Sequence, residues 1–314
     1  MTAGERVGLL FPGQGSQAVG MGRDLAERFP AAREVWERAD DALGFALSTL
    51  CWEGPEDELT LTRNAQPALL AHSAAAWAVL RAAEIDVVCA AGHSLGEFSA
   101  YHAAGSLELG DALRTVRRRG ELMFESGRAR PGTMAAVLGL DDEVVEGVCR
   151  EASTDASVVV AANFNSPGQV VVSGDVAAVE RAGPMLVSAG ARKVQPLNVS
   201  GAFHSPLMAV AEPGLAEQLD AVGFRDPAFP IVSNVTAHPV SDAAEARRLL
   251  VDQLTSAVRW THSVRTMLQL GVTRFLEVGS GRVLTGMLKR IDPAAAGAGT
   301  ALGTAEQLEA FLAG

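Results

Sequence analysis

The hydrophobic positions of the chain alternate between short apolar runs and longer segments with apolar residues at helical spacing. Val7 to Phe11 is an apolar run that ends at a Pro-Gly pair, which predicts a buried strand entering a tight loop. Asp24 to Leu50 has apolar residues at helical spacing among charges, and the alanine-rich segment Ala65 to Ala83 predicts a buried helix. Val87 to Ala91 predicts a second strand, and Glu97 to Ala104 predicts a helix close behind it.

The pattern of apolar and polar residues changes after about Arg128. Asp111 to Ser126 still has the periodicity of an amphipathic helix. Beyond it the pattern predicts a strand, a helix, two strands, a helix and a strand, at residues 132–140, 141–152, 158–162, 170–173, 175–189 and 193–197. This order matches a split βαβ unit, which is typical of a small α+β subdomain. We therefore expect an inserted subdomain at 129–197 within a larger unit made of residues 1–128 and 198–314.

The larger unit is expected to resume with alternating strands and helices. Strands are predicted at Ile231 to Val235 and at Arg274 to Val278, and a helix is predicted at Arg282 to Ile291. The Ala/Gly-rich stretch after Pro293 predicts a surface loop.

Composition indicates a globular protein and argues against membrane-spanning, secreted and nucleic-acid-binding classes. Charged residues make up 20% and hydrophobic residues 48%, which is typical of a globular protein. No stretch approaches the roughly 20 apolar residues of a membrane span, and the N-terminus lacks the features of a secretory signal, so we expect a cytoplasmic location. Three widely spaced cysteines indicate neither disulfides nor a zinc site, and the net charge of −11 argues against nucleic-acid binding.

The pentapeptide GHSLG, residues 92–96, lies between a predicted strand and a predicted helix. A glycine-x-serine-x-glycine in this context is the nucleophile elbow, in which a sharp turn exposes the serine hydroxyl. Ser94 would then stand at a helix N-terminus, where main-chain N–H groups can stabilise an oxyanion. The plainer alternative is a serine that caps a helix after a glycine turn.

A serine nucleophile needs a base within hydrogen-bond reach, and the chain has six histidines. His204 lies in VSGAFHSPLM, a loop bounded by glycine and proline, which makes it the leading candidate. Spacing alone leaves the other histidines open; they are His72, His93, His102, His238 and His262.

Seven motifs together resemble one known family. They are FPGQGSQ at 11–17, GHSLGEFSA at 92–100, RRRG at 117–120, NFNSPGQVVVSG at 163–174, GAFHSPLM at 201–208, QLTSAVRW at 253–260 and EVGSGRVLTGMLKR at 277–290. They look like malonyl-CoA:acyl carrier protein transacylase, in the family's order and nearly from end to end. The resemblance implies an α/β fold, with an α/β-hydrolase-like large domain and an inserted ferredoxin-like subdomain.

The resemblance also implies the roles of individual residues. Ser94 matches the acylated nucleophile and His204 the general base, with a main-chain carbonyl near Gln253 in place of an acidic triad member. The N–H groups of Leu95 and Gln14 are expected to form the oxyanion hole. Gln253 is also expected to line the active site.

Five positions bear on the acyl group or its cleft. Arg119 matches the family's carboxylate-binding arginine, and its planar guanidinium can hold a carboxylate with two hydrogen bonds. Phe203 and Leu95 are of the types that accompany malonyl rather than methylmalonyl in related polyketide acyltransferases. Asn163 and Asn165 match an asparagine-rich turn near the cleft, either in contact with substrate or only closing the turn.

The expected reaction is a ping-pong transfer of malonyl from malonyl-CoA to the phosphopantetheine thiol of a holo acyl carrier protein, supplying fatty-acid or polyketide synthesis. Malonyl-CoA, coenzyme A and the carrier protein are the expected partners of a monomer. No nucleic acid, membrane, metal or cofactor is expected to take part. The alternatives are a trans-acting acyltransferase for a substituted extender, a serine thioesterase or hydrolase, and a non-catalytic docking module.

The carrier protein is expected to be acidic, as this chain is, so docking needs a local basic surface. We predict that Lys193, Lys289 and Arg290 contribute to it. Asn234, in SNVTAH, matches a family motif and is expected to stabilise a loop.

Overall fold

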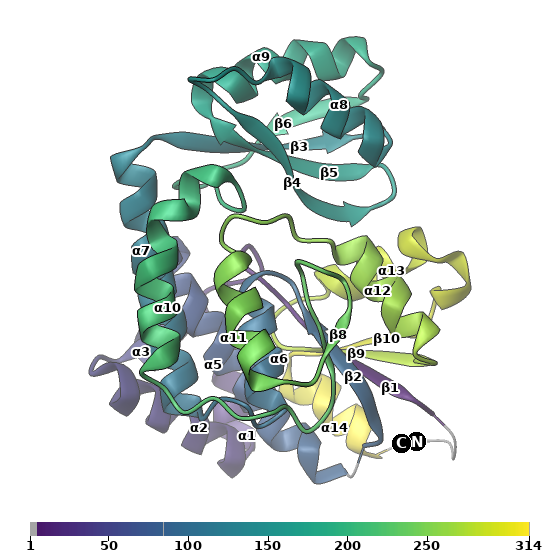
Figure 1. Ribbon diagram of the computed structural model, residues 1–314. Coiled ribbons are helices and arrows are strands. Elements are labelled where there is room, and N and C mark those ends of the chain that lie inside the picture. The colour runs from purple at the N-terminus through teal and green to yellow at the C-terminus, as the bar shows by residue number, and fades with distance from the viewer. Residues whose placement is uncertain (1–4, 84, 314) are drawn as a thin grey trace.

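The computed structural model describes residues 5–83 and 85–313. Two sheets form two stacked parts (Figure 1). The larger part contains a six-stranded sheet of order β10-β9-β1-β2-β7-β8, in which only the β7–β8 pair is antiparallel. Its strands are β1 (Val7–Phe11), β2 (Val87–Gly92), β7 (Ile231–Val232), β8 (Pro239–Val240), β9 (Arg274–Val278) and β10 (Gly299–Leu302).

Helices cover this sheet on both sides (Figure 1). The first half of the chain supplies α1 (Arg23–Arg28), α2 (Pro30–Leu43), α3 (Leu47–Glu53), α4 (Glu56–Thr60), α5 (Thr62–Leu80), α6 (Leu95–Ala103), α7 (Leu109–Ala129) and the 3-10 turn η1 (Arg81–Ala83). The second half supplies α10 (Glu212–Asp220), α11 (Ala243–Asp252), α12 (Trp260–Gln269), α13 (Val283–Ile291), α14 (Ala305–Ala313) and the 3-10 turns η2 (Pro206–Ala211) and η3 (Pro293–Ala295). The alanine-rich α5 packs against α2, α6 and α7, because its small side chains let neighbouring helices approach on nearly every side.

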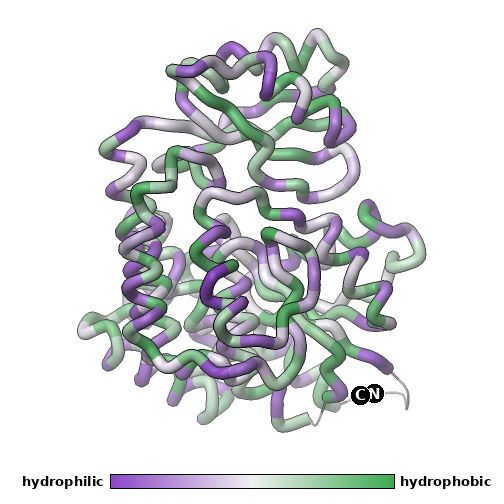
Figure 2. Tube along the Cα trace, viewed as in Figure 1, coloured by the Kyte–Doolittle hydropathy of each residue, from purple (hydrophilic) through white to green (hydrophobic). Residues whose placement is uncertain are grey.

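The smaller part is an antiparallel sheet of order β4-β5-β3-β6 with two helices on one face (Figure 1). Its elements are β3 (Gly132–Leu138), α8 (Asp142–Ala152), β4 (Val159–Ser166), β5 (Gln169–Asp175), α9 (Val176–Ser188) and β6 (Lys193–Pro196). Much of β4 and β5 is hydrophobic (Figure 2), and these strands bury their own apolar cluster against α8 and α9. The predicted order of elements is confirmed, whereas the domain limits at 129 and 197 stay a prediction.

Two predictions for the larger part are wrong. The Ala/Gly-rich stretch predicted as a surface loop contains β10, which pairs in parallel with β9 at the edge of the sheet. A Cβ added at Gly299 would lie 2.9 Å from the Leu288 side chain, so the small residue there reflects close packing rather than a loop. The strand predicted to reach Val235 ends at Val232, because residues 234–236 form a turn.

Other expectations concern the chain as a whole. Among the described residues, no helix is both long and apolar enough to cross a membrane. Cys51, Cys89 and Cys149 are buried thiols that form no disulfide.

Candidate active site

The turn between β2 and α6 is tight and strained. Ser94 has a φ of 50° and a ψ of −107°, a backbone conformation that a residue with a side chain rarely adopts. A Cβ at Gly92 would lie 1.9 Å from the Gly96 carbonyl carbon, and one at Gly96 would lie 2.1 Å from the Phe11 oxygen. Only glycine fits at both positions, which explains the spacing of the pentapeptide and gives Ser94 the exposed geometry of a nucleophile elbow.

Asn234 holds this turn in place. Its Oδ1 accepts the Ser94 main-chain N–H at 2.7 Å, and its Nδ2 donates to the Gly92 carbonyl oxygen at 2.7 Å. Asn234 is fully buried, and the two hydrogen bonds join both sides of the turn through one amide. The loop that Asn234 stabilises is therefore the elbow itself.

Ser94 and His204 form a hydrogen-bonded pair, called here the dyad. Ser94 Oγ lies 2.8 Å from His204 Nε2, and His204 Nδ1 donates to the Gln253 main-chain oxygen at 2.9 Å. Because Nδ1 carries the hydrogen, Nε2 is the acceptor for the serine proton. Burial, with the nearby Arg119 cation as a second cause, lowers the pKa of His204 to about 3, so the imidazole is a neutral base near pH 7.

Arg119 points at the dyad from α7. Its side chain is 1% exposed, and its Nη1 donates to Gln66 Oε1 at 2.9 Å. Its Nη2 donates to Gln253 Oε1 at 2.8 Å and to Ser94 Oγ at 3.1 Å, while its buried Nε has no partner among the described residues. Burial lowers the pKa of Arg119 to about 10, and the Glu97 carboxylate opposes this fall, so the guanidinium stays charged near pH 7.

Two buried side chains of the site, Glu97 and Gln66, were not predicted from the sequence. Glu97 Oε2 accepts from Gln253 Nε2 at 2.7 Å, and burial raises the pKa of Glu97 to about 7. Both are polar residues within predominantly apolar helices, and neither is solvent-exposed. That pattern was the available signal, because a polar side chain facing a core usually has a specific partner.

A cavity of about 360 Å³ opens above the dyad. Its lining joins both parts of the molecule, with Met134 and Val171 on strands of the smaller sheet and Leu95 and Met123 on helices of the larger part. The cavity brings together most of the predicted site residues, namely Gln14, Ser94, Leu95, Arg119, Asn163, Asn165, Phe203 and His204. Gln253 lies directly beneath them, in contact with both Arg119 and His204.

Five of these predicted residues take distinct places around the cavity. Leu95 begins α6, so its N–H has no intrahelical partner, and Gln14 follows β1, where its N–H is unpaired among the described residues. Asn163 and Asn165 lie on β4 rather than in the predicted turn, and Asn165 Oδ1 is 2.9 Å from His93 Nε2, so it contacts the elbow rather than Ser94 Oγ. Phe203 is 6% exposed and contributes an apolar wall.

The other histidines have different surroundings. His72 and His102 bond to main-chain carbonyl oxygens, while His238 and His262 line a separate small cavity. In the part of the chain that the structure describes, only His204 lies within hydrogen-bond distance of Ser94 Oγ. The tertiary structure therefore singles out His204, among the six histidines, as the hydrogen-bond partner of Ser94.

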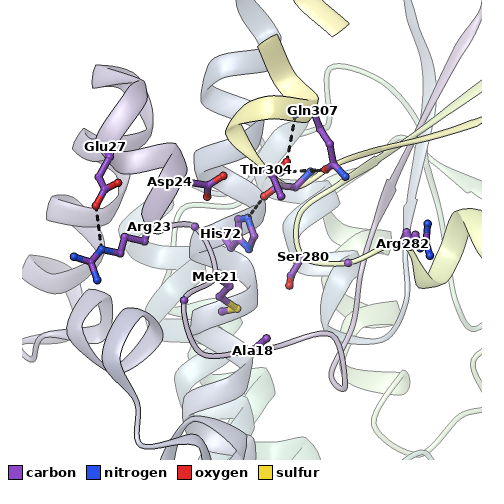
Figure 3. A pocket seen from close by; sticks show the side chains of 14 residues that line it. Ala18, Met21, Arg23, Asp24, Glu27, His72, Ser280, Arg282, Thr304 and Gln307 are labelled. Atoms are coloured by element: carbon purple, nitrogen blue, oxygen red, sulfur yellow. Dashed lines mark hydrogen bonds and ion pairs between the residues drawn. The ribbon is translucent and has the colours of Figure 1, made fainter. Parts of the chain in front are cut away.

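A second and larger cavity, of about 730 Å³, includes neither member of the dyad (Figure 3). Arg23 in its wall pairs with Glu27 at 3.0 Å, and His72 Nε2 donates to the Gly303 carbonyl oxygen at 2.8 Å (Figure 3). Across residues 5–83 and 85–313, no group of three or more His, Cys, Asp or Glu side chains could hold a metal ion. The smaller cavity is the candidate active site because both members of the dyad and Arg119 line it.

Comparison with known proteins supports this assignment. Residues 9–301 match the acyl transferase domain family. The chain is 45% identical over 287 residues to the malonyl CoA-acyl carrier protein transacylase of Bacillus subtilis, covering 91% of this chain and 90% of that protein.

Solved structures agree with this likeness. An acyl carrier protein S-malonyltransferase from Vibrio cholerae superposes with a TM-score of 0.94 and 40% identity, covering 98% of this chain and 100% of that one. A malonyl-transacylase in complex with its type II PKS acyl carrier protein superposes with a TM-score of 0.92 and 41% identity, covering 98% and 99% of the two chains. The predicted α/β-hydrolase-like fold with a ferredoxin-like subdomain is confirmed, and the chain belongs to the acyl transferase domain family.

Proposed function

We propose that the protein transfers a malonyl group from malonyl-CoA to the phosphopantetheine thiol of a holo acyl carrier protein through a malonyl ester of Ser94. The observation that carries the proposal is the buried Arg119 guanidinium, whose Nη2 is 3.1 Å from the nucleophilic oxygen. A buried cation at that distance suits an acyl group that ends in a carboxylate. Relatives of about 45% identity are named for this activity.

The first half-reaction acylates the serine. His204 Nε2 takes the Ser94 proton as Oγ attacks the thioester carbonyl carbon, and the N–H groups of Leu95 and Gln14 hold the oxyanion. The carbon–sulfur bond then breaks, and coenzyme A leaves as a thiol protonated by His204. Malonyl-Ser94 and free coenzyme A are the products of this step.

The second half-reaction reverses the first with a different thiol. The phosphopantetheine thiol gives its proton to His204 and attacks the ester, and Ser94 Oγ leaves and recovers the proton. One thioester replaces another, so the reaction is close to thermoneutral and freely reversible. Every step uses groups of the chain and its substrates, so the proposal requires no metal or redox cofactor.

Arg119 binds and orients the malonyl group while it is attached to Ser94. Once Ser94 Oγ is part of an ester it is a weaker acceptor, which leaves Nη2 and the unpaired Nε to bind the malonyl carboxylate. Two hydrogen bonds from a guanidinium also orient the acyl chain toward the oxyanion hole.

The walls of the cavity favour the unsubstituted acyl group. Phe203 and Leu95 are both buried apolar side chains that line the space beside the dyad. A methyl group at C2 would crowd Phe203, although one methyl is worth only about 1–3 kcal/mol of discrimination. We propose malonyl as the preferred group, with Asn163 and Asn165 shaping the cleft side of the cavity.

The competing function is hydrolysis, in which water attacks the acyl-serine. Incubation of the protein with malonyl-CoA, with and without holo carrier protein, separates the two. Transfer predicts malonyl-carrier formation and little free malonate, with a malonyl adduct detected by mass on the wild type and absent from Ser94→Ala. Steady release of malonate at a rate that the carrier does not change would overturn the transferase.

We also propose that the carrier protein docks on exposed basic residues. Lys193 on β6 and Lys289 and Arg290 on α13 are exposed. Arg290 Nη1 also donates to Gln169 Oε1 at 3.0 Å, so it bridges the two parts of the molecule. We propose that the enzyme works as a monomer in the cytoplasm and divides into a subdomain at 129–197 and a larger domain formed by the rest.

A further inference from the structure

One buried side chain of the site, Glu97, has no part in the chemical steps above. It lies on the first turn of α6, is 0% exposed, and accepts through Oε2 from Gln253 Nε2 at 2.7 Å and from the Asn234 main-chain N–H at 3.2 Å. Its Oε1 has no partner among the described residues. A buried carboxylate with an unpaired oxygen costs stability, so Glu97 is a candidate for a role in the reaction.

Glu97 is the nearer of two acceptors that determine which way the Gln253 amide points. The NH₂ group of that amide donates to Glu97 Oε2 at 2.7 Å and to the Ser94 main-chain oxygen at 3.1 Å, and its Oε1 accepts from Arg119 Nη2 at 2.8 Å. A carboxylate only accepts and a guanidinium only donates, so a reversed amide would face a mismatch on both sides. Glu97 thereby keeps the amide oxygen of Gln253 on Arg119.

The charge of Glu97 acts on the same group. Burial works against the positive charge of Arg119, and the Glu97 carboxylate is the charge that opposes this effect. Arg119 has no ion pair with another side chain among the described residues. Its hydrogen bonds go to the neutral acceptors Gln66, Gln253 and Ser94, and its guanidinium lies 5.4 Å from the centroid of the Phe98 ring. Glu97 therefore bears on Arg119 chiefly through the Gln253 amide, and the neutral variant Glu97→Gln separates this contact from any effect of the charge.

We propose that Glu97 is a positioning residue for carboxylate recognition: acting through Gln253, it holds the Arg119 guanidinium toward the acyl cavity and so sets the preference for acyl groups that end in a carboxylate. This inference rests on the proposed function. A merely structural role for Glu97 would affect every acyl group alike, whereas a role through Arg119 affects only those with a carboxylate.

The test compares three measurements on the same variants. They are kcat/KM for serine acylation by malonyl-CoA, the same quantity for acetyl-CoA, which lacks the carboxylate, and the rate of Ser94 inactivation by phenylmethylsulfonyl fluoride. Glu97→Ala removes the acceptor, and Glu97→Gln keeps an oxygen that can accept the same two hydrogen bonds. Ser99→Ala is the matched control, because Ser99 is buried on the same helix and its hydroxyl has no partner among the described residues.

We expect Glu97→Ala to lower kcat/KM for malonyl-CoA by about 10- to 100-fold, as for a lost hydrogen bond to a charged group. Acetylation and inactivation by the sulfonyl fluoride should stay within about threefold, because Glu97→Ala leaves in place the Gln253 main-chain oxygen that holds His204 and the bond from Gln253 Nε2 to the Ser94 main-chain oxygen at 3.1 Å. Glu97→Gln should recover most of the malonyl activity, and Ser99→Ala should match the wild type. If Glu97→Ala does not fold, Glu97→Asp serves instead: its carboxylate is one methylene shorter, so the 2.7 Å contact with Gln253 Nε2 is lengthened, and the loss should again be confined to malonyl-CoA.

Three results would overturn the inference. They are unchanged malonyl acylation in Glu97→Ala, an equal loss in all three measurements, and a Glu97→Gln variant as impaired as Glu97→Ala. Failure of the proposed function looks different, because the wild type itself would then form no malonyl adduct.

Discussion

Replacing Arg119 by methionine removes the charge and the hydrogen-bond donors while retaining most of the side-chain volume. Arg119 is 1% exposed and faces Ser94 Oγ at 3.1 Å, so a malonyl carboxylate bound there would be a buried charge pair. Loss of one partner of such a pair costs about 2–5 kcal/mol. At about 1.4 kcal/mol per tenfold, kcat/KM for malonyl-CoA should fall by roughly 30- to 5,000-fold.

Acetyl-CoA supplies the internal comparison for Arg119→Met. It offers no carboxylate, so its acylation rate should change by less than about tenfold, the effect of one lost hydrogen bond to Ser94 Oγ. The assay is single-turnover acylation of Ser94, followed by intact mass for both thioesters. The variant leaves the Gln66 and Gln253 amide oxygens unpaired, so thermal unfolding is measured alongside, with a Tm lower by a few degrees expected.

Arg118→Met is the matched control for this experiment. The Arg118 side chain is 42% exposed, and its Nη1 lies 3.8 Å from Glu121 Oε2. Such an exposed ion pair contributes about 0–1 kcal/mol to stability. Both acylation rates should match the wild type. The reasoning fails if Arg119→Met keeps malonyl acylation within about threefold, or if acetyl and malonyl acylation fall together.

The remaining predictions probe the base, the elbow, the docking surface and the acyl cavity. Burial lowers the pKa of His204 to about 3, so in the free enzyme the imidazole stays neutral well below its ordinary pKa. The value of kcat/KM for serine acylation should therefore not fall with a midpoint near pH 6.5, and a midpoint there in a pH profile from 8 to 5 would contradict this. Asn234→Ala removes both hydrogen bonds that hold the elbow and should lower the free energy of unfolding in urea by about 2–4 kcal/mol. Charge reversal at Lys193 and Lys289 should raise the KM for holo carrier protein and leave serine acylation intact, and an unchanged KM refutes that docking surface. Phe203→Ser should improve methylmalonyl-CoA relative to malonyl-CoA by about tenfold in a direct competition, and an unchanged ratio means that Phe203 does not set the extender.

Local features of the chain were predictable because they depend on neighbours in sequence. The elbow is one example, since Gly92, Ser94 and Gly96 are close in the chain and the turn excludes any Cβ at the two glycines. The elements of the smaller part are another, because alternating and helical patterns specify strands and helices directly. The stretch containing β10 was missed, because small residues carry little pattern and its pairing with β9 is a tertiary contact.

The residues of the candidate site likewise fall into two groups: those that neighbouring sequence places and those that only tertiary packing brings together. The strand-to-helix turn that presents Ser94 was determined by the sequence itself, because adjacent residues and their sterics create it. His204 reaches Ser94 across 110 residues, and Gln253 reaches Arg119 across 134, so packing decided which histidine serves as base. Glu97 has the most context-dependent role, because an acidic residue in a first helical turn is ordinarily a solvated partner of the helix dipole. Only the tertiary structure buries its carboxylate against Gln253, since that contact requires the loops after β7 and α11 to close over α6.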